Sequence, residues 1–282
     1  IHMSVKGSAK RKMQYAKIAK RHGKKVVLHI HSGNFVRYYQ ELLPGQQKKL
    51  RDCLKNADCV MALSRRWKAA FEEVIGLKNC VEMTNGILLS QFPTENDSFG
   101  QRSIDLLFLG RLGENKGTDN LLQVLARLKA EGTQFRCVLA GDGPVQEYKE
   151  KASALGLADE LEFTGWVSGP QKLELLQQAK VMALPSYHEG LPMSILEAMA
   201  CSEAVISTPI GGIPEAVENS VSGMLVPPGD VEHLYAAARL LLRCPERAQQ
   251  MGQRGRAIVE QRYDLRKLHR QLYAIYCSVL GA

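Results

Sequence analysis

Two acidic side chains occupy unusual positions in the stretch HEGLPMSILEAMA, residues 188–200. Glu189 comes just before a Gly-Leu-Pro turn, and Glu197 lies in an apolar segment that predicts a helix starting near Leu191, with Pro192 in its first turn. The free N–H groups at that helix start would bind an anion beside Glu189. About six helical residues, on the order of 9 Å, separate the helix start from Glu197. A sugar, a diphosphate and a ribose would fit this spacing. A loop acid and a helix-face acid without any ligand are the alternative.

Two cations follow another predicted strand, in FLGRLGENKG. The strand ends at Gly110, and Arg111 and Lys116 come next. A glycine lets the backbone approach a ligand, and a nearby Arg and Lys neutralise a diphosphate leaving group without a metal. Two surface cations in an ordinary loop remain the alternative.

A third stretch, LAGDGPVQEYKEKA, resembles part of a dinucleotide-binding fingerprint. Gly141 and Gly143 follow a strand and open a helix, but Gln146 stands where that fingerprint has Gly or Ala. Because the match to the fingerprint is only partial, the motif gives weak support for a nicotinamide-dependent enzyme, and we disfavour that class.

Strand-length apolar runs alternate with helical segments along the chain, which predicts an α/β fold with ligands at the carboxyl ends of parallel strands. The predicted strands lie in KVVLHIHS, CVMALS, CVEMTN, IDLLFLG, FRCVLAG, LEFTG, VMALPS and AVISTP.

The polar, turn-rich stretch PTENDSFGQ, residues 93–101, is interpreted as an interdomain linker. We therefore expect a partial first domain at 1–95 and a second domain at 96–262. Residues 263–282 have apolar side chains at helical spacing, which predicts an amphipathic helix that packs back on the first domain.

The bulk composition is that of a globular protein, with 45% hydrophobic and 23% charged residues among 282. No apolar run is long enough to span a bilayer. The seven cysteines are scattered without a CxxC pair, as is typical of a reducing cytosol. Residues Ile1 to Met3 are interpreted as a cloning remnant and left out of the predicted fold.

Positive charge is concentrated near the amino terminus. Residues 1–95 hold 18 Lys and Arg against 7 Asp and Glu, and the remainder holds 19 against 22. In KRKMQYAKIAKRHGKK, residues 10–25, basic and apolar positions alternate with helical spacing. A solvated helix face and a surface for anionic lipid or a phosphorylated acceptor both fit this pattern. Few aromatic residues interleave with the charges, which disfavours nucleic acid.

Six motifs in order carry a family resemblance: LGRLGENKG, LAGDGP, FTGWV, SYHEGLPMSILEAMA, STPIGGIPEAV and SGMLVPPGD. They resemble the donor-binding half of GT-B retaining glycosyltransferases of the family 4 type, the glycosyl transferases group 1. More loosely, VVLHIHSGNF and VEMTNGILLSQF resemble the central and exit strands of that family's acceptor domain. The resemblance implies two Rossmann-like, doubly wound parallel-sheet domains. The N-terminal domain is expected to be incomplete, because the family's first strand and glycine-rich loop have no counterpart before Lys25.

The resemblance assigns roles residue by residue. It implies that Arg111 and Lys116 contact the donor diphosphate, that Glu189 contacts the transferred sugar, that Glu197 binds the ribose and that His31 is the active-site histidine. It also implies donor contacts by the backbone of Gly110, by the helix-start segment Gly190, Leu191, Pro192 and Met193, and by the nucleobase loop Gly165, Trp166 and Val167.

His29 lies two residues before His31 on the same strand face, so the two rings could instead hold a metal. The sequence shows no third ligand near them, and we expect no metal.

The resemblance implies a retaining transfer of a sugar from a nucleotide-diphospho-sugar to a glycan or lipid-linked acceptor, with no divalent ion and no cofactor. The chain has no Asp-x-Asp triplet of the metal-dependent sugar transferases. A nucleotide-sugar epimerase and a nucleotide-binding fragment without turnover are the alternatives. We expect a cytoplasmic protein, with peripheral contact to anionic membrane through the basic region and no nucleic-acid partner.

Overall fold

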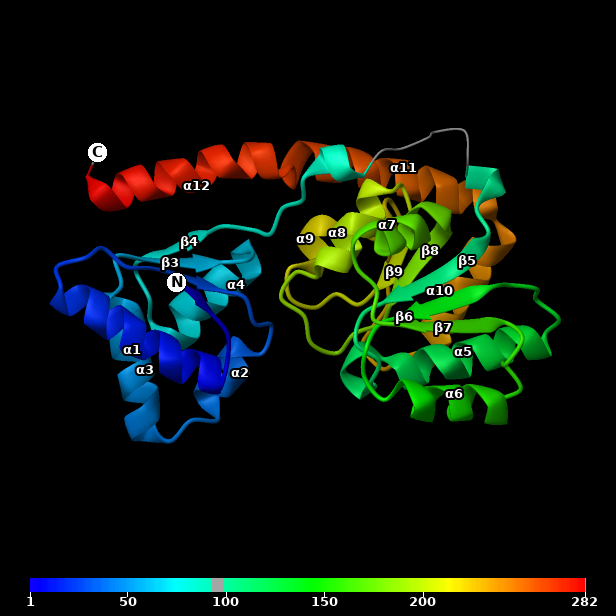
Figure 1. Ribbon diagram of the computed structural model, residues 1–282, viewed down its shortest axis with the longest axis horizontal. Helices are drawn as coiled ribbons and strands as arrows, with labels where there is room; N and C mark the ends of the chain where they lie inside the picture. Colours follow the sequence, from blue (N-terminus) through cyan, green and yellow to red (C-terminus); the bar gives the residue numbers. More distant parts are fainter. Residues whose placement is uncertain (93–98, 282) are drawn as a thin grey trace. The chain divides into compact units, whose positions relative to one another are not determined.

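The structure is a computed structural model that describes residues 1–92 and 99–281. It divides into two compact units (Figure 1). The first comprises residues 1–86, 188–191 and 265–282, and the second comprises residues 87–187 and 192–264. The boundary predicted between residues 95 and 96, and most of the predicted linker, lie outside the described residues.

The first unit contains a four-stranded parallel sheet in the order β1-β2-β3-β4. Interpreting the first three residues as a remnant outside the fold is wrong. His2 and Met3 form β1 in register with His29 and Ile30 of β2, and the side chain of Met3 is buried in the core. The strands are β1 (His2–Met3), β2 (Val27–Ile30), β3 (Cys59–Ala62) and β4 (Cys80–Glu82), and the helices are α1 (Gly7–Arg21), α2 (Phe35–Gln40), α3 (Pro44–Asn56), α4 (Arg65–Ala70) and a π-helical turn, Phe71–Ile75.

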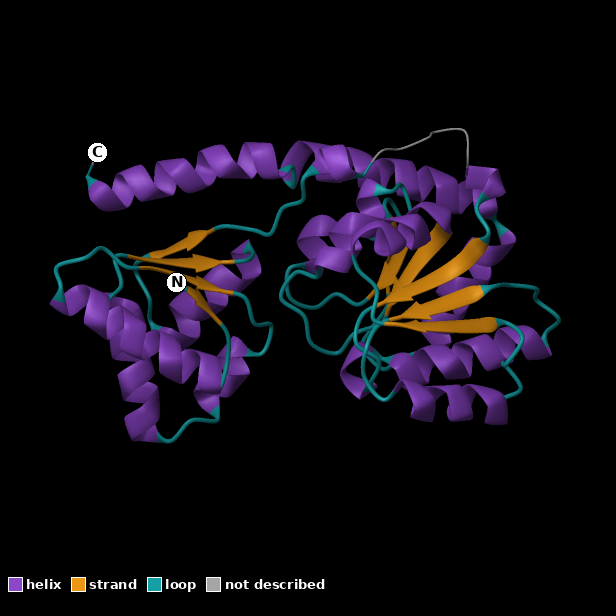
Figure 2. Cartoon of the chain, viewed as in Figure 1, coloured by secondary structure: helices purple, strands orange, loops and turns teal. Residues whose placement is uncertain are grey.

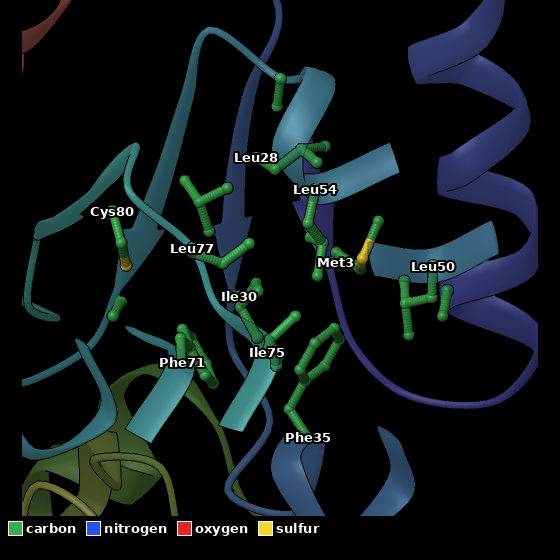
Figure 3. Packing of buried hydrophobic residues seen from close by; sticks show 14 of the residues in the cluster. Met3, Leu28, Ile30, Phe35, Leu50, Leu54, Phe71, Ile75, Leu77 and Cys80 are labelled. Atoms are coloured by element: carbon green, nitrogen blue, oxygen red, sulfur yellow. The ribbon is translucent and has the colours of Figure 1, made fainter. Parts of the chain in front are cut away.

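The two faces of this sheet bury different partners, because side chains alternate along a strand. On one face, Leu28 and Ile30 pack with Leu50 and Leu54 of α3 (Figure 3). On the other face, Cys59 and Met61 of β3 and Met83 pack against apolar side chains of the last helix, α12 (Leu265–Leu280). The C-terminal helix therefore completes the core of the first unit although it is distant in sequence.

The second unit contains a six-stranded parallel sheet in the order β10-β9-β8-β5-β6-β7. Figure 2 shows strands of this sheet with helices packed around them. The chain leaves β5 toward β6 and β7, then returns to place β8 on the other side of β5. Such a reversal is where open α/β sheets bind ligands. The strands are β5 (Ile104–Leu109), β6 (Cys137–Ala140), β7 (Leu161–Gly165), β8 (Ala179–Leu184), β9 (Ala204–Ser207) and β10 (Gly223–Leu225).

Helices follow most strands of the second unit, as the alternating pattern predicts. They are α5 (Thr118–Ala130), α6 (Val145–Ala154), α7 (Gly169–Gln178), α8 (Met193–Ala200), α9 (Ile213–Ala216), α10 (Val231–Arg243) and α11 (Pro245–Arg262), with short 3₁₀ turns at Leu89–Gln91, Phe99–Gln101 and Glu114–Lys116. The eight predicted strands are all present, and the α/β class with two parallel sheets is confirmed. Among the residues that the structure describes, no helix is both long and apolar enough to cross a membrane.

Helix α8 is positioned by its packing against α11, and two glycines of α11 face this contact. A Cβ on Gly252 would lie 1.9 Å from the carbonyl oxygen of Ser202, just after α8. A Cβ on Gly255 would lie 3.5 Å from the side chain of Met199, an ordinary van der Waals distance. Only Gly252 is therefore required for the close approach.

We predict that Gly252→Ala lowers the free energy of unfolding by about 1–3 kcal/mol, because the added methyl forces backbone atoms apart. Gly255→Ala is the matched control on the same helix, and it should be neutral or stabilising by up to about 1 kcal/mol, since Ala favours helix over Gly. Urea unfolding of both variants measures the difference. Equal midpoints would contradict the prediction.

Candidate functional site

Backbone hydrogen bonds join the loops at the carboxyl ends of β5, β6 and β7. The N–H of Gly110 donates to the carbonyl oxygen of Ala140 at 2.9 Å, and the N–H of Gly141 donates to that of Gly165 at 2.8 Å. The predicted site residues Gly110 and Gly165 therefore lie at one edge of the sheet.

The glycines of LAGDGP make room for the neighbouring loop. A Cβ on Gly141 would lie 1.8 Å from the carbonyl oxygen of Gly110, and a Cβ on Gly143 would lie 2.5 Å from that of Leu112. Both glycines have positive φ values, which favour glycine. Backbone packing accounts for this motif without a bound dinucleotide.

Arg111 lies at this edge with an exposed guanidinium group. Its Nη1 is 2.9 Å from Oδ2 of Asp142, and 67% of the Arg111 side chain is exposed. An exposed ion pair contributes little to stability, so exchanging Asp142 for a phosphate group costs little. Sequence analysis missed Asp142 as the partner, although it stands inside a motif that was singled out.

Lys116 lies in a turn that is held against the loop after β8. A Cβ on Gly117 would lie 2.2 Å from the carbonyl oxygen of Pro185, and the N–H of Tyr187 donates to the carbonyl oxygen of Asn115 at 2.9 Å. Hence the loops after β5 and β8, the two strands at the reversal of strand order, are fixed to each other.

Helix α8 begins at Met193, after the extended residue Pro192, two residues later than the predicted start near Leu191. The side chain of Glu197 is nearly buried, and its Oε1 accepts a hydrogen bond from Nζ of Lys172 in α7 at 2.7 Å. No sequence signal pointed to Lys172. The pair explains how an apolar helix accommodates an acid, since a charge this buried needs a close partner.

The loop after β7 presents an aromatic side chain to solvent. Gly165 has a φ of 72°, the side chain of Val167 is buried, and 74% of Trp166 is exposed. A flat exposed indole offers a face for stacking another ring.

The other predicted residues, His31, Glu189, Gly190 and Leu191, belong to the first unit. Nδ2 of Asn85 donates to the carbonyl oxygen of Leu191 at 2.8 Å. A Cβ on Gly190 would lie 3.2 Å from the carbonyl oxygen of His31. A Cβ on Gly33 would lie 2.2 Å from the carbonyl carbon of Glu189. The structure therefore brings the segment after His31 against the Glu189–Gly190 step.

The expectation that no third ligand lies near His29 and His31 is wrong. Nδ1 of His2 lies 2.7 Å from Nε2 of His31, and the rings of His29 and His31 have centroids 4.1 Å apart. Burial, reinforced by the neighbouring His31 ring, lowers the pKa of His29 to about 4, and burial also lowers the pKa of His31. These two rings are therefore neutral at pH 7. His2 was missed because it lies in the segment that had been set aside.

The model of the protein family described as glycosyl transferases group 1 matches residues 94–258, more than half of the chain. The chain belongs to this family. The resemblance drawn from the six ordered motifs is confirmed.

Two curated relatives and one solved structure define the similarity further. The chain is 29% identical over 175 residues to alpha-D-kanosaminyltransferase of Streptomyces kanamyceticus, covering 62% of this chain and 45% of that protein. It is 30% identical over 233 residues to the GDP-mannose-dependent alpha-(1-6)-phosphatidylinositol monomannoside mannosyltransferase of Mycolicibacterium smegmatis, covering 76% of this chain and 61% of that protein. The chain thus spans about half the length of these relatives.

The structure of HepE from Anabaena in complex with UDP superposes with a TM-score of 0.83 at 21% identity, covering 98% of this chain and 78% of HepE. This similarity confirms the predicted GT-B fold class.

Two buried ionisable side chains, Arg102 and Glu203, lie at the far end of α8. Arg102 donates from Nη1 to the carbonyl oxygen of Ala179 at 2.6 Å and from Nη2 to that of Cys201 at 2.7 Å. Glu203 is fully buried, and within the described part of the chain neither of its carboxylate oxygens has a hydrogen-bond partner. Burial raises the pKa of Glu203 well above its usual value, and the charge of Arg102 offsets this only in part.

Glu203→Gln should therefore stabilise the chain at pH 7. The folded carboxyl holds its proton more tightly than the unfolded one, which ionises above about pH 4.3. The wild type therefore loses stability as pH rises from there, and the Gln variant does not. Thermal melting should show a higher melting temperature for Glu203→Gln than for the wild type, and this difference should be larger at pH 7 than at pH 4.5. Glu174→Gln, which changes an exposed acid of α7, is the control. A gain of the same size at both pH values would contradict an ionisation effect.

Proposed function

We propose that this chain acts in the transfer of a sugar from a nucleotide-diphospho-sugar to a glycan or lipid-linked acceptor. The observation that carries the proposal is the carboxyl edge of the six-stranded sheet, where Arg111, the Lys116 turn and the start of α8 all follow strands of one sheet. Membership of the glycosyl transferases group 1 supports the same reaction class.

In this mechanism, Arg111 and Lys116 stabilise the charge that develops on the departing diphosphate. The N–H groups at the start of α8 add the positive end of a helix dipole, since Pro192 has no side-chain group to cap them. Fixed cations and N–H groups of this kind stabilise a leaving group without a divalent ion. We therefore propose a metal-independent transfer.

The sugar is attacked on the face that the diphosphate leaves, which retains the anomeric configuration. The bond from the anomeric carbon to the phosphate oxygen breaks, the bond to the acceptor oxygen forms, and the acceptor proton passes to the departing phosphate oxygen. Glu189 positions the sugar hydroxyls in this proposal. His31 is neutral at pH 7 because burial lowers its pKa, so it serves as a hydrogen-bonding group.

The relatives support a nucleoside diphosphate without selecting its base. The Mycolicibacterium smegmatis relative is named for GDP-mannose, and the HepE structure contains UDP. GDP and UDP share the diphosphate, which Arg111 and Lys116 bind in this proposal. In the same proposal, Trp166 contacts the base and Glu197 accepts a hydrogen bond from a ribose hydroxyl.

Calorimetric titration of the chain with UDP, GDP, ADP and TDP, each with and without EDTA, tests donor binding. We expect one diphosphate to bind with an affinity that EDTA does not change. Arg111→Ala and Lys116→Ala should each raise its Kd by about tenfold or more, the effect of losing a hydrogen bond to a charged group. Arg254→Ala removes an exposed cation of α11 and is the matched control.

Equal affinities for the wild type and both site variants would contradict the proposed diphosphate site. A labelled-donor assay then separates the reaction classes. Isomerisation of the sugar without any acceptor would indicate an epimerase, and binding without turnover of any donor would indicate a nucleotide-binding chain.

We also propose that α1 contacts an anionic membrane surface. Tyr15 and Ile18 are 52% and 53% exposed on this helix, and Arg11 and Lys17 are exposed beside them. A cavity of about 900 Å³ adjoins the helix, with walls that include Lys10, Lys17, Lys20, Arg21 and Lys49. Apolar and basic side chains combined in this way favour the interface of anionic lipid.

Removing charge from α1 should weaken vesicle binding. Each basic residue near an anionic surface contributes about 1 kcal/mol, so Arg11→Gln/Lys17→Gln should lower the partition coefficient by about 20-fold or more. Lys149→Gln/Arg254→Gln removes the same charge from exposed positions of the second unit and should change it little. Sedimentation with neutral and acidic vesicles measures both. Binding that is independent of acidic lipid would contradict the membrane role and leave a phosphorylated acceptor as the ligand of α1.

A further inference from the structure

Three histidine rings from two adjacent strands gather on one face of the first unit's sheet. His2 in β1 is the register partner of His29 in β2, and His31 follows two residues later on the same face. Ring centroids lie 5.6 Å apart for His2 and His29, 4.9 Å for His2 and His31, and 4.1 Å for His29 and His31. One ring nitrogen of each residue lies within 4.8 Å of the others.

The hydrogen bonds of these rings leave nitrogen lone pairs inside the cluster. His29 donates from Nε2 to the carbonyl oxygen of Met83 at 3.0 Å, so its Nδ1 carries no proton in the neutral ring. A backbone carbonyl that accepts from the far nitrogen is the usual support of a metal-binding histidine. Nδ1 of His2 and Nε2 of His31 face each other at 2.7 Å, and a cation bound by both nitrogens would replace this hydrogen bond.

The donor set favours one class of cation. Three imidazole ligands suit Zn²⁺ and similar transition metals, whereas Mg²⁺ and Ca²⁺ require oxygen ligands. Zn–N bonds of about 2.0–2.1 Å place the nitrogens of a tetrahedral site about 3.4 Å apart, which small side-chain rotations reach from the observed cluster. His2 is exposed, so an ion can enter from solvent and keep a water as its fourth ligand.

We propose that His2, His29 and His31 form a Zn²⁺ site and that occupancy of this site inhibits sugar transfer. Inhibition is expected because a ring nitrogen of His31 that coordinates the ion can no longer form a hydrogen bond with the transferred sugar. This second part rests on the proposed function, whereas the metal site itself does not. In the proposed function the transfer needs no metal, so the bound ion acts only as an inhibitor.

Zn²⁺ titration of the metal-free chain, in competition with a chromophoric chelator, tests the site. We expect one equivalent to bind, and Co²⁺ in its place to give the visible absorption of a nitrogen-ligated, four-coordinate ion. His2→Phe and His29→Phe keep a ring at each position and should weaken Zn²⁺ binding by at least about tenfold, the effect of losing one ligand. His22→Ala removes an exposed histidine elsewhere in the first unit and should leave binding unchanged. Circular dichroism checks that each variant is folded.

Stoichiometric Zn²⁺ affinity that is the same in His2→Phe, His29→Phe and the wild type would overturn the site, as would the lack of one-to-one binding. The second assay measures transfer with and without Zn²⁺. The proposed inhibition is supported if Zn²⁺ inhibits transfer by the wild type but not by His2→Phe, which retains His31. Unchanged transfer by a Zn²⁺-saturated wild type would overturn it. If the chain transfers no sugar at all, the proposed function fails while the chelator titration still decides the metal site.

Discussion

The close backbone contact between the loops after β5 and β6 is the constraint on which the rest of the second unit depends. The carbonyl oxygen of Gly110 occupies the space of a side chain at Gly141, so any other residue there would separate the two loops. With these two loops in contact, Arg111 reaches Asp142, and a separate hydrogen bond from Gly141 to Gly165 adds the loop after β7. The three loops therefore meet at one edge of the sheet, where they can act on a single ligand.

Six of the eight strands that the sequence predicts contain three or more apolar residues in a row, and such runs favour burial on both faces of a parallel sheet. β10, Gly223–Leu225, is three residues long and β1, His2–Met3, is two, and neither carries a periodic signal of its own. These strands exist because a longer neighbour offers backbone partners. Their formation is a tertiary effect that local pattern cannot predict.

The residues of the candidate site also divide into those that the sequence predicts and those that it does not. Motif spacing pointed to Arg111, Lys116 and Glu197, because their side chains stand beside glycines and helix starts within one stretch of sequence. The partners of these residues come from elsewhere in the fold. Lys172 meets Glu197 across 25 residues, and His2 meets His31 across 29. Such pairs depend on strand order and helix packing, which a single sequence does not specify.

The Lys172–Glu197 ion pair raises the question of why the apolar helix α8 contains an acidic residue. Breaking a buried ion pair is costly, but replacing both partners with apolar side chains of similar volume is often neutral or stabilising. Stability alone therefore does not account for Glu197, since an apolar residue would suit a helix whose other side chains from Ile195 to Ala200 are all buried. A carboxylate held in one orientation by Lys172 is, however, ready to accept a hydrogen bond from a ligand hydroxyl. The orientation that Lys172 gives this carboxylate therefore fits the proposed ligand-binding role of Glu197.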